Sequence, residues 1–395
     1  MVRVDISSVL VATAIDLATA QSTITVQLKK INTVTNASHL VAGDYARLRH
    51  HHSKHSGNVF RGAISEGSVI NEGNGYIAQT KVGSQTFDLL VDTGSSNTWV
   101  GAHTKFVPGR TANSTGHAVK DSYGKGNFSG IEYIDAVSVG GIGVKQQSIG
   151  VAQFATGFPS ELDGILGLGP VQLTNGTVQG VSEVPTFIQN LLSEGVIAQN
   201  ILGISFAPLQ GIAPESPNGV LTFGGVDANF FKGNITYTPR IPPFWGISAC
   251  SFKFGPNSLG PNSTASYSGF VDTGTTLILL PSPVFTAFLN LTKGSVDPST
   301  GFIAFPANGK PTHDVSFVVG GTTFTMTPEQ YLLPETQYAS WGITAQEAQA
   351  SGGYALFGNA ETAGAPGFVL GIGFLEFFYS VYDTENDRVG LAPAA

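Results

Sequence analysis

One short motif occurs in each half of this chain, and this repetition constrains the fold more than any other feature. FDLLVDTGSSNTWV spans residues 87–100 and SGFVDTGTTLILLP spans residues 268–281, so Asp-Thr-Gly recurs after 180 residues. Downstream of each copy lies an apolar pair followed by glycine, at residues 165–167 and 369–371. Elements repeated in the same order indicate two homologous lobes. We expect them to join near the proline-rich stretch at residues 230–245.

The rest of the chain has the pattern of a β protein. From Tyr76 onward, short apolar runs alternate with Gly, Pro, Asn and Ser, as is typical of strands joined by tight turns. Helical patterns are confined to residues 184–192, 282–291 and 344–350. With 50 glycines and only 12% charged residues, the sequence predicts an all-β, bilobal fold with a few short helices.

The N-terminal part differs from the body. Residues 1–20 form a possible, weak signal peptide, because Asp5 and Asp16 flank its apolar stretch. Residues 21–65 are a basic segment on a chain of net charge −8, which indicates that the segment packs on its own protein. The remaining boundaries are an N-terminal lobe at 66–238 and a C-terminal lobe at 239–395.

The basic segment contains a run of histidines. Such a run can bind a metal ion, but it stands beside Lys54 without acidic or cysteine companions. The pattern therefore favours a solvated face of the segment over a metal site, and no metal or cofactor is expected. The histidines are His50, His51, His52 and His55.

Each Asp-Thr-Gly ends an apolar strand, where the chain must turn. Gly94 and Gly274 permit a tight turn with a close backbone approach. Hydroxyl groups flank both aspartates and can fix the orientation of a carboxylate; they belong to Thr93, Ser95, Thr273 and Thr275. Two ordinary turns are the alternative interpretation, since Asp, Thr and Gly are common in turns. Matching copies in matching halves make that alternative weak.

If a two-fold arrangement brings the loops together, Asp92 and Asp272 form a carboxylate pair. At about 3 Å and an effective dielectric constant of 20, two such charges repel by roughly 5 kcal/mol. The pair then holds one proton in acid. Its ionised member can act as general base on a shared water, while its protonated member donates to the carbonyl oxygen under attack.

At these residues the chain resembles the pepsin family of aspartic proteases, and most closely its fungal secreted members, over about residues 74–395. The resemblance implies that Asp92 and Asp272 are the catalytic aspartates and that Ser95 and Thr275 bond their outer oxygens. Thr93 and Thr273 correspond to the hydrogen-bonded pair that joins the lobes beneath the site.

The same resemblance extends to the substrate side of the site. DSYGKGNFSG at residues 121–130 is similar to the family's flap, a hairpin that closes over bound peptide. Tyr123 corresponds to the flap tyrosine and Trp99 to the tryptophan that hydrogen-bonds it. Gly124, Lys125 and Thr276 are the further expected substrate-binding positions. Lys125 replaces a small or acidic residue, which implies a bias against Lys or Arg at P1.

The resemblance also implies that the basic segment is a pro-segment that inhibits the enzyme intramolecularly. In the family a lysine of this segment pairs with the aspartates, and Lys29 or Lys30 is the candidate here. Such an ion pair weakens once the carboxylates are protonated, which would make acid the trigger for activation.

These observations favour a monomeric acid endopeptidase, made as a zymogen, that cleaves peptides or proteins between hydrophobic residues and binds pepstatin-type inhibitors. The acidic net charge argues against nucleic acid or a membrane as partner. Secretion or vacuolar delivery is expected, and seven Asn-x-Ser/Thr sites indicate a glycoprotein. The alternatives are a pepsin-like binding or inhibitor protein without activity and, more remotely, a carboxylate-pair glycosidase.

Overall fold

The computed structural model describes residues 23–56, 74–124, 126–209, 215–261, 265–364 and 367–395. The expected signal peptide, residues 21–22 and 57–65 of the expected pro-segment and Lys125 lie outside these ranges.

Strands dominate the described chain. Its first strands are β1 (Ile24–Asn32), β2 (Asn74–Val82), β3 (Gln85–Asp92), β4 (Trp99–Val100), β5 (Asn113–Ser122), β6 (Asn127–Val139), β7 (Ile142–Thr156), β8 (Gly164–Gly167), β9 (Ile201–Phe206), β10 (Glu215–Phe223) and β11 (Thr236–Pro239). They are followed by β12 (Gly246–Phe254), β13 (Asn257–Ser258), β14 (Ser266–Val271), β15 (Ile278–Leu280), β16 (Ser295–Val296), β17 (Ile303–Pro306), β18 (Val315–Val319), β19 (Thr322–Met326), β20 (Ser351–Ala355), β21 (Phe357–Asn359), β22 (Phe368–Leu370), β23 (Phe378–Asp383) and β24 (Arg388–Pro393).

Helices are short, apart from the first. The α-helices are α1 (Ala37–Ser56), α2 (Phe187–Ser193), α3 (Ser282–Thr292), α4 (Pro328–Tyr331), α5 (Ala345–Ala350) and α6 (Ile372–Leu375). Single 3-10 turns are η1 (Val171–Thr174), η2 (Ala228–Phe230), η3 (Glu335–Gln337), η4 (Ala339–Trp341) and η5 (Ala360–Ala363). Within the described ranges, none of the helices is long and apolar enough to cross a membrane.

The strands form two large sheets and a small one. The first has the order β11-β24-β23-β9-β10-β1-β2-β3-β8-β4-β7-β6-β5, and the second has the order β19-β18-β12-β14-β22-β15-β21, with β13 beside β12. A third sheet, β16-β17-β20, lies in the C-terminal half. The predicted all-β fold with a few short helices is confirmed, and α2, α3 and α5 coincide closely with the three predicted helical stretches.

The last two strands of the chain, β23 and β24, join the first sheet next to β9 and β11. That sheet therefore links the two halves instead of belonging to one of them. The proposed lobe limits of 66–238 and 239–395 remain a prediction.

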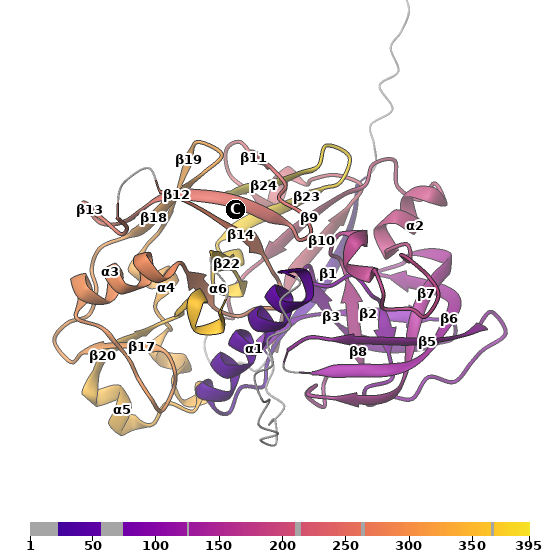
Figure 1. The fold of residues 1–395 in the computed structure, drawn as a ribbon, viewed down its shortest axis with the longest axis horizontal. Coiled ribbons are helices and arrows are strands. Elements are labelled where there is room, and N and C mark those ends of the chain that lie inside the picture. The colour runs from indigo at the N-terminus through magenta and orange to yellow at the C-terminus, as the bar shows by residue number, and fades with distance from the viewer. Residues whose placement is uncertain (1–22, 57–73, 125, 210–214, 262–264, 365–366) are drawn as a thin grey trace, which may run out of the picture.

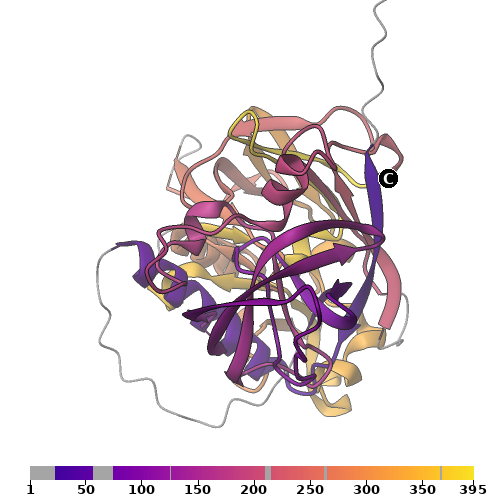
Figure 2. The same ribbon diagram turned by 90° about the vertical axis from the view of Figure 1, so that its right-hand side faces the viewer.

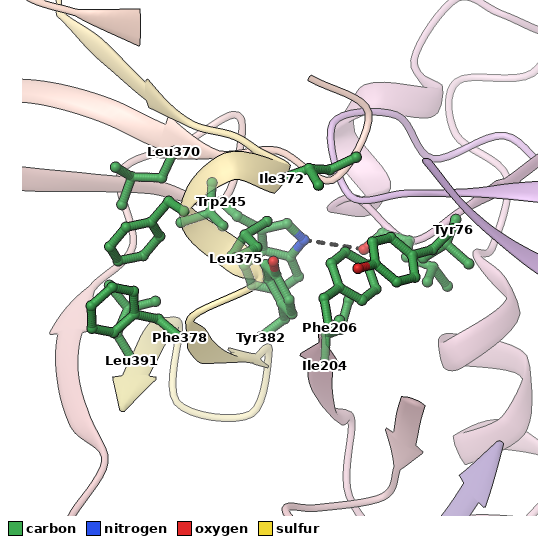
Figure 3. Close-up of a cluster of buried hydrophobic side chains, with 14 of the residues drawn as sticks. Tyr76, Ile204, Phe206, Trp245, Leu370, Ile372, Leu375, Phe378, Tyr382 and Leu391 are labelled. Atoms are coloured by element: carbon green, nitrogen blue, oxygen red, sulfur yellow. Dashed lines mark hydrogen bonds between the residues drawn. The ribbon is translucent and has the colours of Figure 1, made fainter. Parts of the chain in front are cut away.

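A continuous apolar core connects the sheets. Tyr76 of β2 stacks on Phe206 of β9 with ring centroids 3.6 Å apart, and Tyr382 of β23 contacts Trp245 edge-on at 5.2 Å (Figure 3). The Trp245 indole N–H donates to the carbonyl oxygen of Leu168 at 3.1 Å. This core fixes the strands that carry the two aspartate loops.

The described part of the basic N-terminal segment forms one strand and one helix. Strand β1 inserts between β10 and β2 of the large sheet. Helix α1 lies between the part of the molecule that carries β2 to β8 and the part that carries α3 to α5 (Figure 1). Figure 2 shows the strand on one side of the molecule and the helix on the other. The described part of the segment thus runs from one side of the molecule to the other, where α1 lies between its halves.

Candidate active site

Both aspartates stand at the carboxyl end of a strand that runs parallel to a second apolar strand. β3 pairs with β8 and ends at Asp92, whereas β14 pairs with β22 and ends one residue before Asp272. The partner strands β8 and β22 contain most of the two apolar-apolar-glycine elements of the repeat. The sequence repeat therefore corresponds to a repeated local structure.

The hydrogen bonds around the two carboxylates match one another. Ser95 Oγ donates to Asp92 Oδ2 at 2.5 Å, and Thr275 Oγ1 donates to Asp272 Oδ2 at 2.6 Å. The Gly94 N–H donates to Asp92 Oδ1 at 3.0 Å, and the Gly274 N–H donates to Asp272 Oδ1 at 2.9 Å. Both carboxylates are fully buried. Each therefore has one oxygen held by a hydroxyl and the other by the backbone of its own turn.

The threonines of the two motifs join the loops beneath the carboxylates. The Thr93 N–H donates to Thr273 Oγ1 at 2.9 Å, and the Thr273 N–H donates to Thr93 Oγ1 at 3.1 Å. Thr273 Oγ1 donates in turn to the Val91 carbonyl at 2.8 Å, and Thr93 Oγ1 to the Val271 carbonyl at 3.4 Å. This reciprocal set relates the two loops by an approximate two-fold axis.

The two carboxylates lie close enough to share a ligand. Arg47 of α1 donates from a single nitrogen, Nη2, to Asp92 Oδ1 at 2.6 Å and to Asp272 Oδ1 at 3.0 Å. Its Nε donates to Asp272 Oδ2 at 2.8 Å. A Cβ on Gly94 would come within 2.5 Å of Asp272, and one on Gly274 within 2.6 Å of Asp92. Glycine in each motif thus makes room for the other carboxylate.

The cation at the pair is not the one expected from the sequence. Lys30 forms a buried ion pair with Glu376, and Lys29, the other candidate, pairs with Ile77 in the ladder between β1 and β2. The prediction of Lys29 or Lys30 at the aspartates is wrong. Arg47 stands there because β1 is held in the sheet, away from the loops, while α1 reaches them.

Electrostatics follow from this arrangement. Burial and the nearby Asp272 raise the pKa of Asp92, although Arg47 opposes this. Burial alone would also raise the pKa of Asp272. The positive charge of Arg47 and the hydrogen bonds that Arg47 donates to Asp272 instead hold that pKa well below its usual range. Burial would lower the pKa of Arg47, but both carboxylates outweigh it and raise that pKa. Arg47 therefore stays cationic between them.

Helix α1 makes a second polar contact one turn before Arg47. Asp44 Oδ2 accepts from the backbone N–H groups of Thr276 at 3.0 Å and of Leu277 at 2.9 Å. Both donors directly follow the second aspartate loop, and Asp44 is fully buried. Apolar side chains of α1 pack on the same half of the molecule: Leu40, Val41 and Leu48 share a cluster with Leu277, Phe302 and Trp341.

The expected flap covers the helix. β5 and β6 form a hairpin in which Ser122 pairs with Asn127, and the backbone at Gly124 approaches α1 so closely that a Cβ there would overlap Ala46 and Arg47. Gly124 also has φ +81°, a conformation that favours glycine. Lys54 near the end of α1 donates to Asp121 at 3.0 Å.

Aromatic rings pack around Tyr123 at the turn of the flap hairpin. Tyr123 and Trp99 stack with ring centroids 6.2 Å apart, and Phe128 stacks on Trp99 at 4.3 Å. Within the described part of the chain, the Tyr123 hydroxyl and the Trp99 indole N–H have no partner at hydrogen-bonding geometry. Burial raises the pKa of Tyr123 well above its ordinary value. A side-chain interaction with Trp99 acts in the opposite direction on this pKa, so the bond that the family resemblance implies stays a prediction.

The histidine run is not a uniformly solvated face. His51 is 6% exposed and packs edge-on against Phe244 and Phe270, with ring centroids 4.8 and 5.8 Å apart. The expectation of a solvated face is thus wrong for this residue, because His51 lies one turn after Arg47 and points into the same space. The described residues hold no group of three or more metal-binding side chains.

Arg47, Asp44 and His51 are the residues near the second aspartate loop that the sequence interpretation missed. A signal for them exists: the positions 40, 44, 47, 48 and 51 follow a helical repeat and define one face of α1. That face carries charged and polar groups, which are usually assigned to the solvent side.

A two-lobed β fold with paired Asp-Thr-Gly loops defines the class of protein. The chain belongs to the eukaryotic aspartyl protease family, whose model matches residues 75–394, and it is an aspartic-type endopeptidase of the pepsin-like kind. It is 40% identical to polyporopepsin of Irpex lacteus over 80% of this chain and 93% of that protein. It is also 30% identical to gastricsin of Cavia porcellus over 94% of this chain and 95% of that protein.

A solved structure agrees with these relatives. The crystal structure of an aspartic proteinase from Irpex lacteus matches with a TM-score of 0.76 and 34% identity, covering 95% of this chain and 98% of the other. Fold and family thus agree with the sequence prediction.

Proposed function

We propose that this chain is the inactive precursor of an acid endopeptidase whose catalytic residues are Asp92 and Asp272. One observation carries the proposal: a single nitrogen of Arg47 bonds both carboxylates. Two carboxylates that bond one atom can also hold one water molecule. The ionised member takes a proton from that water, and the protonated member donates to the scissile carbonyl oxygen. The roles then reverse to protonate the leaving amine.

The remaining motif residues support this pair. Ser95 and Thr275 fix the outer oxygens, and Thr93 and Thr273 hold the loops in register, so neither carboxylate has to reorganise during the reaction. Tyr123, Trp99 and Gly124 belong to the hairpin that would close over substrate, and Thr276 offers a backbone N–H next to the site.

Residues 21–65 act in this proposal as an intramolecular inhibitor. Arg47 occupies the position of the catalytic water. Asp44 accepts hydrogen bonds from the backbone N–H groups of Thr276 and Leu277, which are then not free to bind substrate. Substrate therefore cannot enter until α1 leaves. The surface of the C-terminal half against which α1 packs is largely apolar. Its exposure after α1 leaves agrees with a preference for hydrophobic residues around the scissile bond. The bias of Lys125 against basic P1 residues, secretion or vacuolar delivery and glycosylation remain predictions.

The decisive test is proteolysis of a denatured protein at pH 4 by the processed enzyme, after the pro-segment has been removed and the mass verified. Asp92→Asn is expected to lower kcat by a factor of about 10² to 10⁴. Glu183→Gln, which neutralises an exposed carboxylate, is the matched control and should retain activity. A processed wild-type sample that leaves the substrate intact would instead identify a pepsin-like binding protein.

A further inference from the structure

His51 is buried next to the proposed active site, although the proposed inhibition by Arg47 and Asp44 does not require it. Its ring is buried in α1 one turn after Arg47, and its Nε2 has no hydrogen-bond partner in the described part of the chain. It forms one wall of a cavity of about 250 Å³, together with Leu48, Phe244 and Phe270 among others. A buried, unpartnered imidazole near a fixed cation is costly to protonate.

The groups that face His51 come from three directions. On its own helix these are Arg47, His50 and Lys54, which carry or can carry positive charge. From the second aspartate loop comes Asp272, whose Oδ2 lies 3.9 Å from His51 Nε2. From the strands and loops of the C-terminal half come the neutral rings of Phe244 and Phe270.

Asp272 does not compensate for the charge of a protonated His51. The same oxygen already accepts from Arg47 Nε at 2.8 Å and from Thr275 at 2.6 Å, and 3.9 Å is too long for a hydrogen bond. Burial is the largest effect, the charge of Arg47 adds to it, and together they lower the pKa of His51 well below its ordinary value against the attraction of Asp272.

We propose that protonation of His51 is the first step of activation: the imidazolium, buried beside Arg47 and two phenylalanine rings, expels α1 from the site in mild acid. This inference rests on the proposed function, because it names the trigger that removes the inhibitory helix. It assigns that trigger to the pro-segment itself and not to the catalytic carboxylates.

The direction of the pH effect follows from linkage. The docked helix holds His51 neutral, so docking is strongest above about pH 6.5, the ordinary pKa of histidine. Docking then weakens by up to tenfold per pH unit as the pH falls toward the lowered pKa of the docked state. The Arg47–Asp272 pair behaves differently: its contribution is complete above the ordinary pKa of aspartate, about 3.9, and is lost only below it. Between about pH 4 and 6.5, the contribution of His51 to docking therefore changes with pH, whereas that of the Arg47–Asp272 pair does not.

Hydrogen–deuterium exchange of the full-length precursor tests this. Short pulses from pH 4.5 to 7.5, corrected for the intrinsic exchange rate, report how often α1 leaves its site, while intact mass reveals any cleavage. In the wild type, protection of residues 37–56 should fall about tenfold between pH 7.5 and 5.5. In His51→Gln it should stay flat over that interval. His52→Gln, a change to the next histidine of the same helix, should behave like the wild type.

Equal pH profiles for the wild type and His51→Gln would overturn the proposal. So would a wild-type helix that stays protected down to pH 4.5. Failure of the proposed function has a different signature: α1 leaves the site in mild acid as expected, but the processed protein cuts no substrate at any pH. His51→Phe keeps the site filled and neutral and should also give a flat profile, which separates loss of titration from loss of packing.

Discussion

Arg47 shows how one side chain can satisfy two buried carboxylates at once. Its planar guanidinium uses two nitrogens and three hydrogen bonds, which the point charge of a lysine ammonium cannot match in geometry. Because Arg47 is only 2% exposed, little of this pairing is screened by water. The contact therefore anchors α1 over the site.

Replacing Arg47 by Gln should loosen that anchor. The change leaves two buried carboxylates without their cation, and breaking a buried ion pair in this way costs about 3–5 kcal/mol. A pepstatin-type inhibitor must displace α1 to bind, so the intact Arg47→Gln precursor should bind it at least a hundredfold more tightly than the wild type does. Calorimetric titration at pH 6 measures this.

Arg49→Gln provides the matched control, because Arg49 lies on the exposed side of the same helix. It should bind the inhibitor as the wild type does. Equal affinities for the Arg47→Gln and wild-type precursors would show that α1 is not held by this contact.

At the scale of elements, β1 and α1 are held by different kinds of interaction. β1 is bonded on both edges, to β10 and to β2, and its buried ion pair between Lys30 and Glu376 is supported by the Tyr76 hydroxyl at 3.0 Å. α1 is held by apolar contacts and, unlike β1, by charged and titratable groups at the active site. The two elements should therefore respond differently to acid.

We expect release in two stages. At pH 5, amides of residues 24–32 should remain protected, while those of residues 37–56 exchange at least tenfold faster than at pH 7.5. The strand keeps its hydrogen bonds to β10 and β2 because backbone hydrogen bonds do not titrate. Protonation of His51, in contrast, weakens the docking of the helix. Exchange measured separately on peptides from the two segments checks this. Simultaneous loss of protection in both would refute a staged release.

The sequence predicts β1 and α1 as elements of an inhibitory segment, but not that α1 is the one that reaches the aspartates. TITVQLKK alternates as a strand does, and the basic stretch after it is compatible with a helix. The buried face of α1, however, carries Asp44, Arg47 and His51, so its periodicity looks like that of a solvent-facing helix. Asp272 and Thr276 lie more than 200 residues away from these side chains, and Asp92 lies 45 residues after Arg47, so no local pattern encodes the pairing.

At the scale of the whole molecule, the repeat predicted the architecture well. Two Asp-Thr-Gly motifs in matching contexts indicated two related halves whose loops meet, and the reciprocal bonds of Thr93 and Thr273 have that symmetry. The repeat could not predict that the two C-terminal strands join the first sheet. β23 and β24 enter the first sheet because their apolar faces complete its core, which is a tertiary effect.

The threonine pair should accordingly stabilise the contact between the halves. Thr273→Val keeps the shape of the side chain but removes the acceptor of the Thr93 N–H and the donor to the Val91 carbonyl. Each buried group left without a partner costs about 1–3 kcal/mol. We expect the free energy of unfolding in urea at pH 6 to fall by about 2–5 kcal/mol, and Asp92 and Asp272 to lose their common register, so that activity of the processed enzyme falls as well. Thr323→Val, at an exposed position of strand β19, is the control and should change stability by less than about 0.5 kcal/mol. An unfolding transition for Thr273→Val that coincides with that of the control would mean that the two halves are held together by their shared sheet and core alone.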